Sequence, residues 1–354
     1  MLDVALRNVS HAGVLHDVTL TFPAGKHTAI TGPPACGAST LLRLIAGTLK
    51  PARGEIVIGA RDVTNVKASR RPLLYVTSDI DVPQRWSVQH ALIAAARTRT
   101  LDREDRHREY ALAVEKWELE TILERRLDSL SSTEIARVHF ARVELLRPAI
   151  VIADRWLERG GDLADMLYRT MRVIGATVIS APAMRAELAF SDRIVVLEEG
   201  RVVQAGTAAE VFEHPVSEAA AIATGNADVI PIAIRGNVVD SVIGSWDVSD
   251  PPFQGSGVAL VRPSDFSPAA PGEDSDLIFG VEEAGFADGR WIAKGVLSGG
   301  VTLRVELPRE TNVHKGRLLA LRYDPSRFRL LPRELEPLRA TVPTDVVPPL
   351  RETR

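Results

Sequence analysis

The stretch that decides the fold is AITGPPACGAST, Ala29–Thr40. A short apolar run enters a glycine-containing turn, and the helical pattern of ASTLLRLIAGTL follows at once. The spacing of the glycines, with Ser39 and Thr40 behind them, matches GxxxxGK[ST], the loop that wraps phosphate groups between a strand and a helix. Ala38 stands where that pattern has lysine. The sequence therefore predicts a phosphate-binding loop that lacks its positive charge.

Composition bounds the class of protein. The chain has 354 residues, of which 45% are hydrophobic and 25% are charged, which is typical of a soluble globular protein with two domains. A net charge of -3 argues against a nucleic-acid partner, and no apolar run is long enough to span a bilayer. The N-terminal residues lack a signal-peptide pattern, and the single Cys36 excludes an internal disulfide. These features predict a cytoplasmic setting.

The organisation along the chain changes twice. Up to residue 231, alternating runs and the short apolar runs PAIVIADRW and GATVISAP predict an α/β domain with buried parallel strands, interrupted by a helical block over about 86–146. The charged run Arg97–Arg108 in that block is interpreted as a solvated helix face, with contact to a membrane subunit as the alternative. Residues 232–334 show short alternating runs separated by Gly and Pro, which predict a second, all-β domain. A Pro-rich tail occupies 335–354.

Three scaffold segments carry a resemblance to a known family. They are TLLRLIAGTLKPARGEIVIGARDV, LSSTEIARVHFARVELLRPAIVIAD and SDRIVVLEEGRVVQAGTAAEVFEHP, in family order. The chain resembles the ATP-binding subunits of ABC transporters, of the importer type with a C-terminal TOBE domain, and Ala259–Phe266 (ALVRPSDF) resembles TOBE segments of sugar, polyamine and ferric-iron importers. The resemblance implies an α/β P-loop NTPase domain of the ABC type with a helical subdomain, followed by a small all-β OB-like TOBE domain.

The resemblance assigns the nucleotide loop residue by residue. The nucleotide-binding positions are Gly32, Pro33, Pro34, Ala35, Cys36, Gly37, Ala38, Ser39 and Thr40. Pro34 removes an N–H donor, Ala35 adds a side chain where the family usually has Gly, and Ala38 removes the charge. The resemblance also implies ATP and Mg²⁺ as cofactors, with Ser39 and Asp154 as metal ligands when nucleotide binds. The altered loop predicts that nucleotide binding is weak or lost.

The catalytic positions of the family are also altered. Asp154 matches the Walker B aspartate, but Arg155 stands where the family has the glutamate that polarises the attacking water. The family glutamine aligns with Thr77 and the switch histidine with Ala183. Removal of the lysine and of the base both weaken the charge stabilisation on which phosphoryl transfer depends. The sequence therefore predicts that hydrolysis is lost or strongly reduced.

Other nucleotide-facing segments differ from the family in the same way. The signature LSGGQ reads LSSTE, at Leu130, Ser131, Ser132, Thr133 and Glu134. The adenine-stacking aromatic is replaced by Ala12, and the loop that usually reads SALD is ERGG, Glu158–Gly161. Because the signature loop of one subunit completes the ATP site of the other in this family, the altered signature affects the partner's site as well.

The working hypothesis is a catalytically degenerate subunit that forms the structural and coupling half of an ABC importer. The resemblance implies membrane permease subunits and a second ATP-binding subunit as partners, in a heterodimer rather than a homodimer, at the cytoplasmic face of the membrane. Two alternatives remain open. One is a weakly active ATPase that energises transport, and the other is a regulatory protein outside transport that uses the TOBE domain as a sensor.

Overall fold

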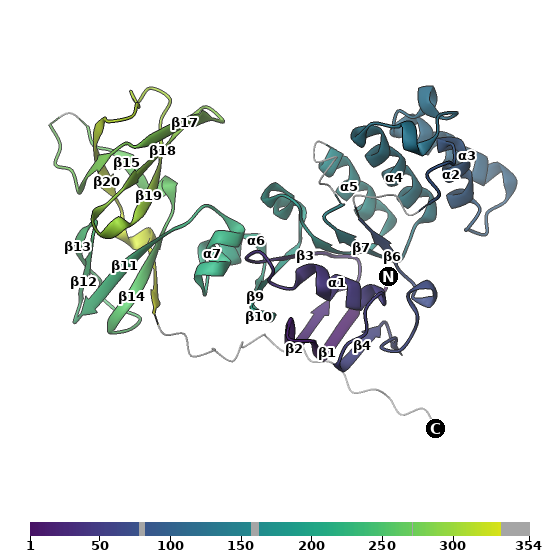
Figure 1. The fold of residues 1–354 in the computed structure, drawn as a ribbon, viewed down its shortest axis with the longest axis horizontal. Coiled ribbons are helices and arrows are strands. Elements are labelled where there is room, and N and C mark those ends of the chain that lie inside the picture. Colours follow the sequence, from purple (N-terminus) through teal and green to yellow (C-terminus); the bar gives the residue numbers. More distant parts are fainter. Residues whose placement is uncertain (78–81, 157–162, 271, 334–354) are drawn as a thin grey trace. The chain divides into compact units, whose positions relative to one another are not determined.

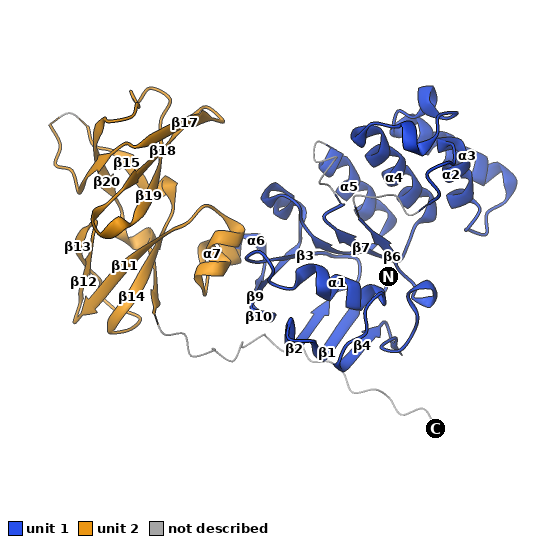
Figure 2. Ribbon diagram, viewed as in Figure 1, with its two compact units in different colours: residues 1–209 blue, residues 210–354 orange. Residues whose placement is uncertain are grey.

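The computed structural model describes residues 1–77, 82–156, 163–270 and 272–333 (Figure 1). Two compact units make up the chain, Met1–Ala209 and a second unit that begins at Glu210 (Figure 2). The boundary expected after residue 231 falls inside β11 (Asp228–Arg235), because this strand starts four residues earlier than the change in sequence texture suggested. The predicted α/β fold followed by β-structure is confirmed.

A six-stranded sheet forms the centre of the first unit. Its strands are β3 (His27–Thr31), β6 (Leu74–Val76), β7 (Ile150–Asp154), β8 (Thr177–Ala181), β9 (Arg193–Glu198) and β10 (Arg201–Gly206). The order is β10-β9-β3-β8-β7-β6, and all neighbours are parallel except β10 with β9. The carboxyl ends of β3, β6, β7 and β8 therefore meet at one edge of the sheet, where α/β folds place ligands.

A second, antiparallel sheet lies in the same unit. Its strands are β1 (Val4–His11), β2 (Leu15–Phe22), β4 (Arg53–Ile58) and β5 (Arg61–Asp62), in the order β2-β1-β4-β5. Buried side chains of β1, β2 and β4 share one core with α1 (Ala38–Ala46), which follows β3. Arg71 fixes the far end of this helix, because its Nη1 donates to the carbonyl oxygens of Leu44 and Ile45 at 2.8 and 2.6 Å.

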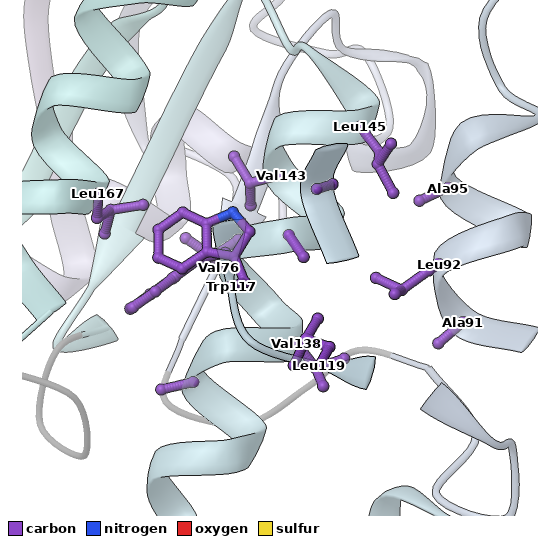
Figure 3. Close-up of a cluster of buried hydrophobic side chains, with 14 of the residues drawn as sticks. Val76, Ala91, Leu92, Ala95, Trp117, Leu119, Val138, Val143, Leu145 and Leu167 are labelled. Carbon is purple, nitrogen blue, oxygen red and sulfur yellow. The ribbon is translucent and has the colours of Figure 1, made fainter. Parts of the chain in front are cut away.

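Helices fill the block expected over about 86–146. They are α2 (Val88–Ala96), α3 (Arg103–Lys116) and α4 (Ser132–Leu146), with α5 (Ala164–Ile174) after them and short 3-10 helices at Ala68–Arg70, Glu120–Ile122, Leu127–Ser129 and Arg185–Phe190. Trp117 is 1% exposed and lies among apolar side chains of β6, α2, α4 and α5 (Figure 3). Its indole N–H donates to Glu144 at 2.7 Å, so the buried ring is satisfied at its polar edge. This core holds the helices together.

A buried histidine supports the strand that leads to the loop. His27 begins β3, its Nε2 lies 2.8 Å from the Ser180 hydroxyl, and its ring stacks on Tyr168 with centroids 4.5 Å apart. Burial lowers the pKa of His27 to about 4, so the imidazole is neutral in the fold. The strand before the loop is therefore fixed by side chains on two other elements, β8 and α5.

In its described residues, the second unit contains three antiparallel sheets and two short α-helices. The elements are α6 (Ala208–Glu213, which crosses the boundary), α7 (Glu218–Thr224), β11 (Asp228–Arg235), β12 (Val238–Ser241), β13 (Gly244–Asp247), β14 (Gly255–Val261), β15 (Phe266–Pro268), β16 (Leu277–Gly280), β17 (Glu283–Ala287), β18 (Arg290–Val296), β19 (Thr302–Leu307), β20 (Leu318–Tyr323) and β21 (Arg329–Pro332), with 3-10 helices at Pro263–Asp265, Ser298–Gly300 and Pro325–Arg327. The sheet orders are β13-β12-β11-β14-β21, β15-β20-β16 and β17-β18-β19.

A charged pair joins two of these sheets. Arg304 of β19 donates to Asp228 of β11 through both Nε and Nη2, at 2.8 and 2.7 Å. The Asp228 side chain is 7% exposed, and the bidentate contact satisfies its buried oxygen. No helix in the described parts of the chain is long and apolar enough to cross a bilayer.

Candidate functional site

The loop between β3 and α1 depends on glycine at two positions. A Cβ at Gly32 would lie 2.0 Å from the carbonyl oxygen of Leu197, so no side chain fits there. Gly37 caps α1 with φ 101°, and no side chain caps this helix end. Ala35 also has a left-handed backbone, with φ 64°, a conformation that costs a non-glycine residue energy. The loop thus keeps a glycine-dependent turn at a helix N-terminus.

Two N–H groups of this loop are committed within the loop itself. The Cys36 N–H donates to the Pro33 carbonyl at 3.0 Å. Burial raises the pKa of the Cys36 thiol, and a hydrogen bond from the Ala38 N–H opposes that rise. Pro33 and Pro34 have no N–H at all. Four of the six positions from 33 to 38 therefore offer no free N–H to a phosphate group.

Asp154 ends β7 and receives hydroxyl donors on both carboxylate oxygens. Ser39 Oγ donates to Oδ1 at 2.8 Å, and the Tyr75 hydroxyl, from β6, donates to Oδ2 at 3.1 Å. Burial and then the negative charge of Asp154 raise the pKa of Tyr75 to about 12, so the phenol keeps its proton. The oxygens of Ser39 and Asp154 are ligands that suit Mg²⁺, and these two residues would hold it.

Arg155 leaves the strand with a left-handed backbone. Its φ is 51°, its N–H donates to the Ala181 carbonyl at the end of β8 over 2.9 Å, and its side chain is exposed. Thr77 directly follows the end of β6 and is half-buried. Asp154, Arg155 and Thr77 thus lie at the same sheet edge as the loop, as their positions after neighbouring parallel strands require.

A buried carboxylate holds the backbone around Ala183. Glu187 Oε1 accepts the N–H groups of Ala183 and Met184 at 2.9 and 2.8 Å, and the Tyr168 hydroxyl lies 3.4 Å from Oε2. Burial raises the pKa of Glu187, although the two backbone N–H groups oppose this. Position 183 is therefore fixed in space, but its methyl side chain offers no hydrogen-bonding group.

The signature segment forms an ordinary capped helix start. Ser131 Oγ accepts the Glu134 N–H at 3.3 Å, and Glu134 Oε2 accepts the Ser131 N–H at 2.7 Å, which together form a capping box. Arg125 donates to the other oxygen of Glu134 at 2.7 Å. The backbone N–H of Ser131 is the main cause that lowers the pKa of Glu134, so the carboxylate is charged.

Comparison with known proteins agrees with this geometry. Residues 15–158 match the family model described as ABC transporter. The chain carries an ABC transporter domain. It is 27% identical to an Fe(3+) ions import ATP-binding protein of Escherichia coli O157:H7, over 77% of this chain and 81% of that protein. It is 26% identical to an sn-glycerol-3-phosphate import ATP-binding protein of Agrobacterium fabrum, over 93% and 98% respectively.

A solved structure supports the fold of the ABC domain. It is cbiO1 from Clostridium perfringens, part of the transporter complex cbiONQ, and it matches with a TM-score of 0.51 and 22% identity. The match covers 60% of this chain and 90% of that one. At this identity the likeness establishes the fold of the ABC domain and nothing about its chemistry.

Several contacts of the ABC domain were not expected from its sequence. Tyr75 lies on β6, and Thr77 directly follows this strand. Because alternate residues of a strand face the same side of the sheet, this spacing indicated that Tyr75 lies on the same side as Thr77. Glu187 and Arg125 lie in segments without a motif and gave no such signal. Ala12 lies exposed with φ 37° in the turn between β1 and β2, and Glu158–Gly161 lies outside the described residues.

Proposed function

We propose that the chain is the ATP-binding-type subunit of an ABC importer in which ATP hydrolysis is lost or strongly reduced. Both relatives described above are import ATP-binding proteins by name, which supports the importer assignment. The observation that carries the loss of chemistry is the loop, where Ala38 has no charge and the N–H groups of Cys36 and Ala38 are committed internally. Phosphate charge would meet fewer N–H donors there and no lysine cation.

The positions around Asp154 support the same proposal. A general base must reach the attacking water, and Arg155 is a cation that cannot accept a proton from it. Ala183 lacks a side chain that could orient that water or sense the γ-phosphate. Ser39 and Asp154 would still hold Mg²⁺ with bound ATP, so the site retains part of its metal-binding set.

The signature segment extends the proposal to the partner subunit. In the capping box, the N–H groups of Ser131 and Glu134 bind this chain's own side chains, and the Glu134 carboxylate adds negative charge. A phosphate group would be repelled by that charge at the helix end where anions usually bind. We propose that the chain contributes position and coupling to permease subunits at the cytoplasmic face of the membrane, beside a different ATP-binding subunit.

A weakly active ATPase is the second candidate, because Ser39 and Asp154, the two residues that would hold Mg²⁺, lie within 2.8 Å of each other. Steady-state phosphate release from the purified chain, with Mg²⁺ and ATP, separates the two. We expect background turnover in the wild type. In Ala38→Lys we expect about tenfold tighter binding of a fluorescent ATP analogue without turnover, since catalytic groups that act as a unit are not restored singly.

The control for this experiment is Asp154→Asn, which keeps the shape of the side chain and removes its charge. Turnover that exceeds background in the wild type and disappears in Asp154→Asn would establish the weakly active ATPase instead. Family-like turnover in Ala38→Lys alone would show that Arg155 or Ala183 does not block the reaction.

A further inference from the structure

An open groove of about 960 Å³ lies between α2 and α3, away from the loop and Asp154. Its lining from α3 includes Arg103, Arg106, His107 and Tyr110, which recur with the i, i+3, i+4, i+7 spacing of one helix face. Ile93 and Arg97 line the groove from α2 and its C-cap. The charged run interpreted from sequence as a solvated helix face therefore forms one wall of a concave surface.

The groove concentrates positive charge in an acidic chain. Among the described lining residues, three arginines face one carboxylate, that of Glu104, which gives 3 − 1 = +2 with His107 neutral. The whole chain carries -3. A concave, low-dielectric wall focuses such a charge on whatever enters it. The groove therefore favours anionic ligands, although the net charge of the whole chain is negative.

The neighbouring charges balance this excess only in part, because the one further carboxylate that acts on a lining residue, in the described parts of the chain, is Glu124, beside Tyr110. Off the lining, Arg99 pairs with Glu109 and Arg108 pairs with Asp105. By contrast, the side chains of Arg97 and Arg103 have no hydrogen-bond or ion-pair partner within the described residues. Two guanidinium groups with free donors therefore face the groove.

A third guanidinium is held in place. Arg106 Nη2 donates to the Leu101 carbonyl at 2.7 Å, so its orientation is set before any ligand arrives. Ile93 and the Tyr110 ring add apolar surface to the same lining. A fixed cation beside an apolar wall is suited to a ligand that has both an anionic and an apolar part.

We propose that this groove binds a small organic phosphate, with the phosphate on the Arg97, Arg103 and Arg106 guanidinium groups and the apolar part against Ile93 and Tyr110. Guanidinium groups match phosphate oxygens with paired donors, and a dianion matches the excess charge of the lining. The volume is within the range of small-molecule sites. The site is independent of the nucleotide loop and of the function proposed above.

Isothermal titration of the full-length chain with phenyl phosphate at low ionic strength tests the proposal. We expect saturable binding with one site, and binding weaker by about tenfold or more in Arg103→Ala. Arg103→Lys should recover part of the affinity, since it restores charge without the fork of donors. Arg108→Ala is the matched control, because Arg108 is on the same helix but off the lining, and we expect its affinity to stay within about twofold of wild type.

Three results would overturn the proposal. One is the absence of saturable binding at millimolar phenyl phosphate. Another is binding that Arg103→Ala leaves unchanged and Ser39→Ala removes, which would place the probe at the nucleotide loop. The third is an acidic peptide that binds in an Arg103-dependent way while phenyl phosphate does not, which would assign the groove to a protein partner. None of these results depends on whether the chain hydrolyses ATP.

Discussion

The N-terminal ends of α1 and α4 are stabilised in opposite ways. α1 starts after Gly37 without a side-chain cap and without an acidic residue in its first turn. α4 starts after Ser131 with a full capping box and with Glu134 in its first turn. The proposed function assigns both helix ends to nucleotide-facing segments, yet only the first depends on backbone geometry alone. The second depends on its own side chains.

The difference concerns how the N–H groups of the first helical turn are satisfied. A helix end without a side-chain cap leaves N–H groups that an anion can bind, whereas a capping box satisfies them internally. At α4, the side chains of Ser131 and Glu134 satisfy N–H groups at the helix start. At α1, the loop has a left-handed backbone at Ala35 and Gly37 and no side-chain cap.

The largest effect that tests this comparison is expected at Gly32. A Cβ there would lie 2.0 Å from the Leu197 carbonyl oxygen, so Gly32→Ala should lower the free energy of unfolding by about 3 kcal/mol. Gly13→Ala is the matched control, because Gly13 also has positive φ but nothing within 4 Å of its Cβ position, and it should cost only about 1 kcal/mol. Urea denaturation measures both. Equal losses would mean that the loop backbone is not the constraint.

The next effect is expected at Ser131. Ser131→Ala removes the hydroxyl that accepts the Glu134 N–H and should lower the free energy of unfolding by about 1 kcal/mol. Ser132→Ala is the control, since that exposed hydroxyl makes no hydrogen bond within the described residues. If both variants were equally stable, α4 would not depend on its cap, and the contrast with α1 would fail.

The smallest effect concerns the charge of Glu134. Glu134→Gln keeps an acceptor for the Ser131 N–H but removes the charge that faces Arg125 and the helix end, at a cost of about 0.5 kcal/mol. Because the folded pKa of Glu134 is lowered, its stabilisation is complete above the unfolded pKa and is lost as pH falls through the folded pKa. The difference between wild type and variant should therefore shrink in acid, as thermal melts at several pH values would show. A difference that grew in acid would contradict the assignment.

The sequence predicted elements whose cause is local. The apolar runs PAIVIADRW and GATVISAP form β7 and β8, which are buried and parallel as predicted. The resemblance named Ser39 and Asp154 as ligands of one metal, and in the fold their side chains lie 2.8 Å apart although β8 separates β3 from β7. Such features need only the identity of nearby residues and the order of strands.

The remaining features depend on tertiary contacts. The bond from Tyr75 to Asp154 joins residues 79 positions apart, with no motif that links them. The interpretation of Arg97–Arg108 as a solvated face missed the groove, because a charged helix face looks the same in sequence whether it meets bulk water or a concave wall. Only the packing of α2 against α3 distinguishes them.

Cys36 gives the nucleotide loop a built-in chemical reporter. It is the only cysteine of the chain, its side chain is 8% exposed, and burial raises the pKa of its thiol. A thiol reacts as the thiolate and only when a reagent reaches it, so its labelling rate is set by how often the loop opens. Alkylation of a thiol in the native protein therefore occurs at this loop and at no other position of the chain. The opening frequency of this loop is measurable in the unmodified protein, without an introduced label.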